Sequence, residues 1–115
     1  MNDLQRASDK LSLVFMALAH PIRREILASL TSRDASVKEI AKPYKLSMVA
    51  ISKHLKVLER AGLISKSKNA QLRISHLEAG PLKAASDWVR QYKQFWSDSF
   101  DKLDDYIEEL QKKVK

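Results

Sequence analysis

The chain contains no cysteine, and its 115 residues include only two glycines and three prolines. The absence of cysteine excludes a disulfide framework and any metal site built from thiolates. The longest apolar run, residues 13–19, is far too short to cross a bilayer. The first residues also lack the apolar stretch and cleavage site of a secretory signal peptide. We therefore expect a cytoplasmic protein that has no membrane partner.

The composition is that of an ordinary globular protein, with 44% hydrophobic and 30% charged residues. A chain of this length forms one compact domain and leaves little for a second. The sequence therefore predicts a single domain over residues 1–115.

The excess positive charge is confined to the middle third of the chain. The formal net charge is +7, and the window from residue 36 to residue 76 contains nine basic and two acidic residues. The remaining residues carry 12 basic and 12 acidic side chains, so their charges sum to zero. A localised positive surface favours a polyanionic partner such as nucleic acid. A solvated basic surface without a partner is the alternative, and charge alone does not decide between the two.

A few helix breakers and caps mark the ends of the predicted helices. Apolar residues at helical spacing predict a first helix over residues 5–19, and Pro21 fits the first turn of a second helix. Ser36 and Glu39 have the spacing of a capping box. The short third helix that they open must end near Pro43, because the residue before a proline avoids the helical conformation.

A fourth helix, a β-hairpin and a last helix follow. Ser47 can cap the fourth helix, and Gly62 is typical of its C-terminal end. Short stretches of alternating apolar and polar residues predict a hairpin over residues 63–76, and the last helix is expected over residues 81–112. Two helices joined by a short turn predict a helix-turn-helix over residues 36–61, and the hairpin adds a wing. The predicted fold is therefore mainly α with a small β-hairpin, a winged helix-turn-helix.

The predicted fourth helix has two chemically different faces. Ile51, Leu55 and Leu58 recur at helical spacing and form a stripe that would pack against the preceding helices. The opposite face carries hydroxyl groups, lysines and apolar side chains, which suit a helix that enters a DNA major groove with its N-terminal end. The residues predicted to contact DNA from this helix are Ser47, Met48, Val49, Ser52, Lys53, His54 and Lys56.

The roles of these side chains follow from their chemistry. Serine hydroxyls can bond to bases or phosphates, and Met48 and Val49 can contact a thymine methyl group. Lys53 and Lys56 are expected to bind phosphates, which position a protein without reading the sequence. His54 has two interpretations, a half-buried packing or hydrogen-bonding group, or a contact to the DNA backbone.

The tip of the predicted hairpin is basic and polar. Its predicted contacts, to the flanking DNA backbone or the minor groove, are Lys68, Asn69, Gln71 and Arg73. Because asparagine tolerates a left-handed backbone conformation, Asn69 is expected to allow the turn of the hairpin.

Two stretches of the chain carry a joint motif. The first is formed by Ser47, Ile51, Ser52, His54, Leu55, Leu58, Ala61, Gly62, Leu63 and Ile64. The second is residues 19–27, which follow the pattern Ala-x-Pro-x-Arg-x-x-Ile-Leu. Together they resemble the ArsR family of winged helix-turn-helix repressors, over roughly residues 10–80. The resemblance implies a homodimeric bacterial repressor that binds double-stranded DNA at a near-palindromic operator.

The departures from that family concern metal binding. Metal-sensing members carry cysteines on the third helix, or Asp and His ligands on the last helix. Here residues 39–46 contain no cysteine and residues 81–115 contain no histidine. The three histidines lie on different predicted elements, whereas a tetrahedral site needs converging ligands. We therefore expect no metal site and no cofactor.

The predicted last helix is apolar and aromatic along one side. Leu82, Val89, Trp96, Leu103 and Leu110 recur every seven residues. A small domain cannot cover so long a stripe, so a partner is expected, and the simplest partner is a second copy in two-fold symmetry. The dimer contacts predicted on the first and last helices are Leu11, Val14, Phe15, Leu18, Leu82, Ala85, Trp88, Val89, Tyr92 and Trp96.

Several alternatives stay open beside a dimeric repressor. Trp88, Tyr92, Phe95 and Trp96 are similar to an aromatic cluster in a non-metal branch of the same family, and they could line a pocket for an unidentified small-molecule effector. The whole chain could also be a winged-helix protein-interaction adaptor, an enzyme, or a metal-sensing repressor with an unorthodox site. The sequence has no phosphate-binding glycine loop and no nucleophile motif, so we expect no enzymatic activity.

Overall fold

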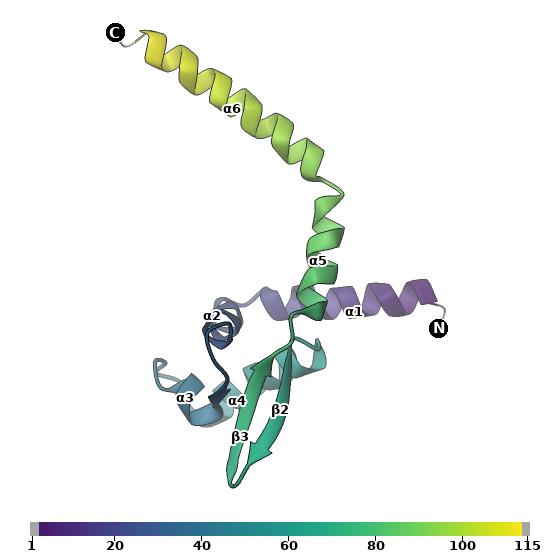
Figure 1. Ribbon diagram of the computed structural model, residues 1–115, viewed down its shortest axis with the longest axis vertical. Coiled ribbons are helices and arrows are strands. Elements are labelled where there is room, and N and C mark those ends of the chain that lie inside the picture. Colours follow the sequence, from purple (N-terminus) through teal and green to yellow (C-terminus); the bar gives the residue numbers. More distant parts are fainter. Residues whose placement is uncertain (1–2, 114–115) are drawn as a thin grey trace. The chain divides into compact units, whose positions relative to one another are not determined.

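The computed structural model describes the backbone of residues 3–113, and the side chains of residues 9–113 except that of residue 100. Its elements, in chain order, are α1 (Asp3–Leu18), α2 (Pro21–Leu30), β1 (Ala35–Ser36), α3 (Val37–Ala41), α4 (Met48–Arg60), β2 (Ile64–Asn69), β3 (Leu72–Leu77), α5 (Gly80–Arg90) and α6 (Lys93–Lys113). The predicted mainly helical fold with a β-hairpin is confirmed (Figure 1). Residues 1–2 and 114–115 of the predicted domain lie outside the described part.

The helix-turn-helix, α3 and α4, begins each helix with a side-chain cap. The capping box of α3 is present: Glu39 N–H donates to Ser36 Oγ at 3.2 Å, and Ser36 N–H donates to Glu39 Oε1 at 3.1 Å. As predicted, α3 ends just before Pro43. The cap of α4 is also present, with Ala50 N–H donating to Ser47 Oγ at 3.1 Å. Both caps satisfy backbone N–H groups that the first turn of a helix leaves unpaired.

The C-terminal end of α4 leads the chain directly into the hairpin. Gly62 adopts a left-handed conformation (φ 74°), and its N–H donates to the Glu59 carbonyl at 2.9 Å. The next N–H, that of Leu63, donates to the Leu58 carbonyl at 3.0 Å. These two bonds form the Schellman motif, which satisfies the last carbonyls of the helix. Leu63 is fully buried, so the chain enters β2 with this side chain anchored in the core.

The apolar core lies between α4 and the helices that precede it. Ile51, Leu55 and Leu58 are fully buried, as their spacing predicts. They belong to one cluster with Val14 of α1 and Ile26 of α2. Truncating a buried leucine or isoleucine to alanine costs about 2–5 kcal/mol. This cluster therefore determines which face of α4 stays outside.

The hairpin belongs to a three-stranded antiparallel sheet with the strand order β1-β3-β2. Strand β1 has only two residues, which pair Ala35 with Ser75 and Ser36 with Ile74 of β3. A pair of residues carries no alternating pattern, so sequence reasoning missed this strand. Its consequence is that the segment before α3 is tied to the wing.

The turn between β2 and β3 differs from its prediction at one residue. Ala70 has the left-handed conformation, with φ 57°, whereas Asn69 pairs with Leu72 in the ladder. The prediction for Asn69 is wrong because this register leaves Ala70 and Gln71 as the two-residue loop. A left-handed alanine costs about 1–2 kcal/mol.

The prediction of one continuous last helix over residues 81–112 is also wrong. Helices α5 and α6 are separated by Gln91 and Tyr92, whose N–H groups donate to the carbonyls three residues earlier at 3.3 and 3.0 Å. Such bonds tighten the last helical turn and end the regular helix. The interruption contains neither proline nor glycine, so the sequence carries no signal for it.

The residues of the chain group into two compact units, residues 1–85 and residues 86–115, where the sequence predicts one domain. The first unit contains the winged helix-turn-helix and the buried core. In the second unit every side chain that the structure describes is exposed. In proteins most of the stability of a helix comes from tertiary packing, which these exposed side chains do not have within the chain.

Glycine and alanine exchanges at the two left-handed positions test these backbone assignments. Gly62→Ala is expected to lower the free energy of unfolding by about 1–2 kcal/mol, because a side chain strains this conformation. The space itself is open, since an added Cβ would meet only Pro81 Cγ, at 3.4 Å. Ala70→Gly is expected to raise stability by up to about 1 kcal/mol. Urea denaturation measures both changes.

Gly80→Ala is the matched control, because nothing lies within 4 Å of its added Cβ and the residue starts α5. It is expected to leave stability unchanged or to raise it slightly, in line with the helix propensity of alanine. Equal losses for Gly62→Ala and Gly80→Ala would contradict the assignment.

Candidate nucleic-acid interface

The outer face of α4 presents most of the predicted DNA contacts to solvent. Met48 and Val49, in its first turn, are 48% and 66% exposed although both are apolar. Lys53 and Lys56 are exposed, and Ser52 is half-buried. These side chains lie on the helix that buries its other face in the core, so one flat surface combines apolar groups, a hydroxyl and two cations. A major groove is wide enough to admit one such helix.

The N-terminal end of α4 is itself suited to an anion. Ser47 uses its oxygen as an acceptor for the cap, which leaves its O–H as a donor. The first turn of α4 contains no acidic residue. Its unpaired N–H groups and the helix dipole therefore present a positive end, the arrangement that binds phosphate at helix N-termini.

His54 is engaged inside the protein. Its Nδ1 lies 3.3 Å from Nη1 of Arg23, and its ring centroid lies 4.5 Å from that of His20. Burial first, and then the charges of His20 and Arg23, lower the pKa of His54 below its ordinary value of 6.5. These contacts favour the packing and hydrogen-bonding interpretation of His54, and its contact to the DNA backbone stays a prediction.

The wing supplies a second group of exposed basic and polar side chains. Lys68 and Arg73 are paired across β2 and β3, next to the turn. Both are exposed, as are Asn69 and Gln71. Because directly paired residues project from the same face of a sheet, Lys68 and Arg73 place two cations side by side at the tip.

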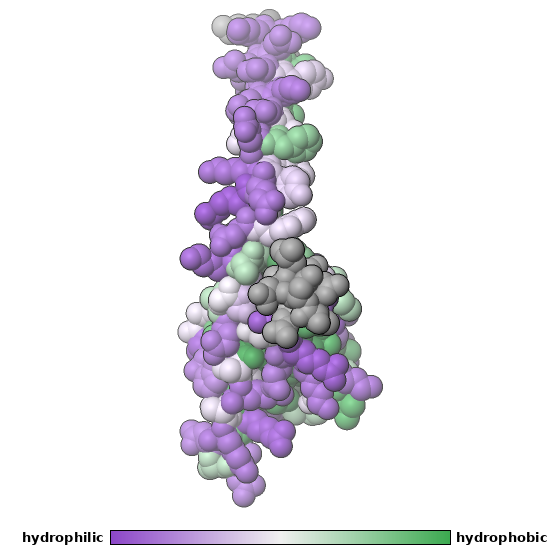
Figure 2. Space-filling view, turned by 90° about the vertical axis from the view of Figure 1, so that its right-hand side faces the viewer, coloured by the Kyte–Doolittle hydropathy of each residue, from purple (hydrophilic) through white to green (hydrophobic). Residues whose placement is uncertain are grey.

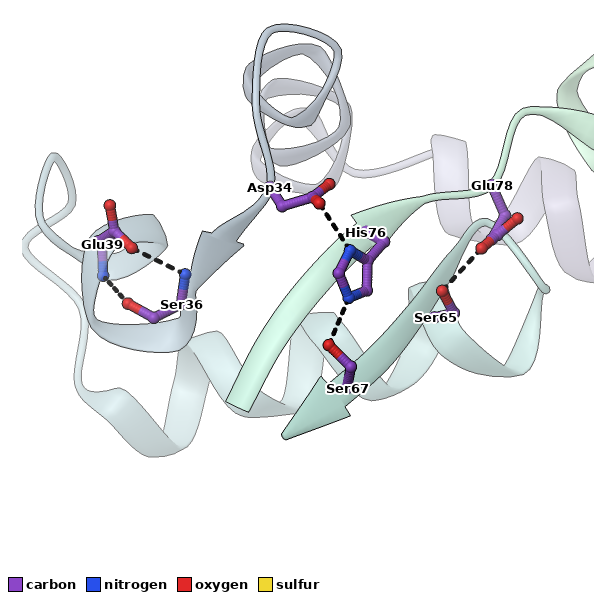
Figure 3. A network of polar contacts seen from close by, with 7 residues as sticks. All are labelled: Asp34, Ser36, Glu39, Ser65, Ser67, His76 and Glu78. Atoms are coloured by element: carbon purple, nitrogen blue, oxygen red, sulfur yellow. Dashed lines mark hydrogen bonds and ion pairs between the residues drawn. The ribbon is translucent and has the colours of Figure 1, made fainter. Parts of the chain in front are cut away.

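A row of polar contacts braces the wing (Figure 3). His76 Nδ1 lies 2.8 Å from Asp34 Oδ2, and His76 Nε2 lies 2.6 Å from Ser67 Oγ. Beside it, Ser65 Oγ donates to Glu78 Oε1 at 2.7 Å. His76 thereby links the segment before β1 to β2 and β3. Sequence reasoning missed this row because its members are far apart in the chain and carry no common motif.

The contacts among Asp34, His76 and Ser67 have the atom pairing of a serine-hydrolase triad. Catalysis also needs oriented donors for an oxyanion and a concave site for the substrate. One pocket among the described residues has a volume of about 90 Å³ and is lined by other residues, among them Ser29 and Glu39. Small-molecule sites are usually several times larger. We therefore assign the row to bracing of the wing.

The predicted dimer contacts differ in how far the single chain already covers them. Val14 and Ala85 are only 3% and 5% exposed, so they belong to the core of the chain. Leu11, Leu18 and Leu82 are half-buried against that core. The contacts that stay exposed are Phe15, Trp88, Val89, Tyr92 and Trp96.

The second unit has one hydrophobic side. Along α6, hydrophilic side chains gather on one flank and hydrophobic ones on the other (Figure 2). Trp96, Leu103 and Leu110, which follow one another at heptad spacing, are 53%, 51% and 42% exposed. The rings of Trp88, in α5, and Tyr92, in the break before α6, have centroids separated by 5.4 Å. The aromatic cluster therefore spans the break between α5 and α6.

Within the described residues, no three His, Cys, Asp or Glu side chains are arranged to hold a metal ion. The two histidines that do come together, His20 and His54, make hydrogen bonds to protein groups through Nδ1. Among the described helices, none combines the length and the hydropathy needed to span a bilayer.

Comparison with known proteins recognises the helix-turn-helix. A family model described as a helix-turn-helix domain matches residues 18–66. The transcriptional repressor SdpR of Bacillus subtilis is 32% identical over 79 residues, which cover 69% of this chain and 88% of SdpR. The transcriptional activator HlyU of Vibrio cholerae is 32% identical over 84 residues, which cover 73% of this chain and 78% of HlyU.

Solved structures share the fold. The crystal structure of an ArsR family transcriptional regulator matches with a TM-score of 0.72 and 32% identity, over 78% of this chain and 93% of that one. The structure of HlyU from Vibrio cholerae matches with a TM-score of 0.61 and 31% identity, over 79% of this chain and 96% of that one. A protein named a repressor and a protein named an activator are thus both similar to this chain.

Removal of the Asp34 carboxylate tests the bracing role of His76. Asp34→Ala is expected to speed amide hydrogen exchange in β3, where Ser75 and Ile74 pair with β1. The global stability should fall by no more than about 1 kcal/mol, because the ion pair is partly exposed. Asp101→Ala, at an exposed position of α6, is the matched control. Equal exchange rates in β3 for the two variants would rule the brace out.

Proposed function

This chain belongs to the ArsR family of winged helix-turn-helix transcriptional regulators, and we propose that it is a homodimeric repressor of a near-palindromic operator. The observation that carries the proposal is the outer face of α4, where Met48 and Val49 stand exposed beside Lys53 and Lys56. This face does not pack into the core of the chain, because the opposite face of α4 already does. In the proposed complex, α4 enters the major groove and the wing tip contacts the flanking backbone.

The charge distribution supports a DNA partner for this face. All nine basic residues of the window from 36 to 76 lie on or next to the helix-turn-helix and the wing, and only two acidic residues accompany them. The phosphate backbone supplies much of the affinity in such complexes. Lys53, Lys56, Lys68 and Arg73 are the proposed phosphate contacts, and Met48, Val49 and Ser52 the proposed base contacts.

The uncovered apolar surface of the second unit supports the second copy. The described side chains there are all exposed, and they include Trp88, Tyr92 and Trp96. Aromatic side chains are enriched where proteins meet, and a two-fold interface lets one surface cover itself. In the proposed dimer, α1, α5 and α6 of one protomer pack against the same helices of its partner.

Two-fold symmetry then sets the form of the operator. The two copies of α4 would enter successive major grooves about one helical turn, roughly 34–36 Å, apart. A dimer bound across a promoter in the cytoplasm would exclude the polymerase and so repress transcription. We favour repression because occupancy alone produces it, without any further contact.

Substitution of the two lysines of α4 tests the DNA contact. The double variant Lys53→Ala/Lys56→Ala is expected to reduce the slope of log affinity against log salt by about four, because each of the two protomers loses two phosphate contacts. Its affinity should fall on specific and nonspecific duplexes alike. Fluorescence anisotropy at several salt concentrations measures the slope.

The matched control removes two exposed lysines from α6, Lys102→Ala/Lys112→Ala, and should leave the slope unchanged. If both double variants bind DNA with the wild-type slope, α4 is not the DNA-binding helix. A basic adaptor that binds another protein would give that result.

A charge placed in the apolar stripe tests the dimer. Trp96→Asp is expected to raise the dimer dissociation constant roughly thirtyfold or more, because burying an unpaired carboxylate costs at least about 2 kcal/mol. Sedimentation velocity measures the monomer–dimer equilibrium. Gln94→Asp adds the same charge on the other side of α6 and should leave the dimer intact. A wild-type chain that sediments as a monomer contradicts the proposal.

A further inference from the structure

One side chain of α2 touches two other helices. The Arg23 guanidinium donates from Nε to the Ala17 carbonyl and from Nη2 to the Met16 carbonyl, both at 2.8 Å. These carbonyls belong to the last turn of α1, and the Met16 carbonyl also accepts from the Ala19 N–H at 3.2 Å. The remaining arm of the fork, Nη1, lies 3.3 Å from Nδ1 of His54 on α4. Arg23 therefore connects α1, which we place in the dimer interface, to α4, which we place on DNA.

The hydrogen bonds around Arg23 and at the start of α2 show which ring nitrogen is the acceptor in His54 and in His20. A guanidinium can only donate, so Nδ1 of His54 must be the acceptor, and the ring is neutral with its proton on Nε2. His20 caps α2 through its own Nδ1, which accepts the Ile22 N–H at 3.2 Å. The two rings lie 4.5 Å apart at an interplanar angle of 54°. A proton on Nδ1 of either ring would replace an acceptor with a donor and break one of these bonds.

The surroundings of His54 also oppose its protonation. Burial is the largest cause of its lowered pKa, and electrostatic interactions with His20 and then Arg23 lower it further. From α1, the uncharged carbonyls of Met16 and Ala17 accept hydrogen bonds from the Arg23 guanidinium. Because the folded-state pKa lies below the ordinary 6.5, the stabilisation is complete above about pH 6.5 and is lost as the pH falls through the folded-state value.

We propose that Arg23 is a positioning residue that holds the recognition helix α4 in register with α1, and that proton uptake by His54 releases this hold and weakens operator binding in mild acid. A protonated His54 would place two cations, its ring and the Arg23 guanidinium, next to each other. The Arg23 guanidinium would then turn away from His54, and α4 would lose its hydrogen-bonded link to α1. The DNA part of this proposal rests on the proposed function, whereas the protonation part does not.

The direction of the pH effect on operator binding distinguishes a release of α4 from the mere addition of positive charge. Protonating histidines adds positive charge, and added charge strengthens binding to phosphate. A release of α4 predicts the opposite, weaker binding at lower pH. No merely structural role of Arg23 or His54 produces a pH-dependent loss that a neutral isostere removes.

The first experiment needs no DNA. Histidine NMR on the full-length protein is expected to show His54 in the Nε2–H form near pH 7.5 and titrating below about 6.5, the ordinary histidine value. Arg23→Lys keeps the charge but loses the planar fork, so the Nδ1 acceptor role of His54 should weaken. A wild-type His54 that carries its proton on Nδ1, or that titrates at or above the ordinary value, overturns the proposal.

The second experiment measures operator affinity at constant ionic strength between about pH 7.5 and about pH 5.5, the range in which histidines change charge. Wild-type binding is expected to weaken at least about fivefold, the lower end of ordinary coupling between sites. His54→Asn should remove this dependence, because its Oδ1 can accept from Arg23 and cannot be protonated.

His76→Asn is the matched control, because His76 lies on the wing, and this variant should retain the wild-type pH dependence. Affinity that rises in acid, or a pH dependence that His54→Asn leaves intact, overturns the proposal. An absence of any specific complex near pH 7.5 overturns the proposed function instead, and the NMR titration still decides the state of His54.

Discussion

The burial of one face of α4 is the constraint on which the rest of the structure depends. Ile51, Leu55 and Leu58 are fully closed off from solvent, and each contributes about 1.5–3 kcal/mol by leaving water. Because this stripe meets α1 and α2, the opposite face must point outward, with its lysines and its exposed apolar side chains. The same helix ends at Gly62, where the Schellman motif delivers Leu63 to the core and sends the chain into the wing. The candidate interface is therefore a consequence of packing.

The chemistry of the chain is divided between its two units. The first unit carries the basic helix-turn-helix and wing, while the rest of the chain balances its charges and presents apolar aromatic surface. Such a division suits a regulator in which one part meets DNA and another meets a second copy. Within the first unit, Arg23 and the two histidines around it connect α1 and α4 through hydrogen bonds that a proton can break. In the proposed regulator, DNA affinity, dimer assembly and sensitivity to pH would depend on three different groups of side chains.

Most of the fold could be predicted from the sequence, because its signals are local. The Ser36–Glu39 capping box, the Ser47 cap, Gly62 and the apolar stripe of α4 all act within one or two helical turns. What could not be predicted depends on residues far apart in the chain. The strand β1 exists only by pairing with β3, the left-handed residue of the wing follows from the strand register, and His54 has its role only because α2 brings His20 and Arg23 beside it. The break between α5 and α6 has no proline or glycine to announce it.

Binding to the DNA upstream of the protein's own gene is the most direct test of the central claim, that two copies of α4 read an operator. A gel shift with excess nonspecific competitor, at two salt concentrations, followed by footprinting of the retained complex, provides it. The account predicts a discrete, competitor-resistant complex with two protected segments about 10 base pairs apart, whose affinity falls steeply with salt. Weak binding that competitor DNA removes, with no paired protection, would contradict it and would point to a basic adaptor whose partner is a protein.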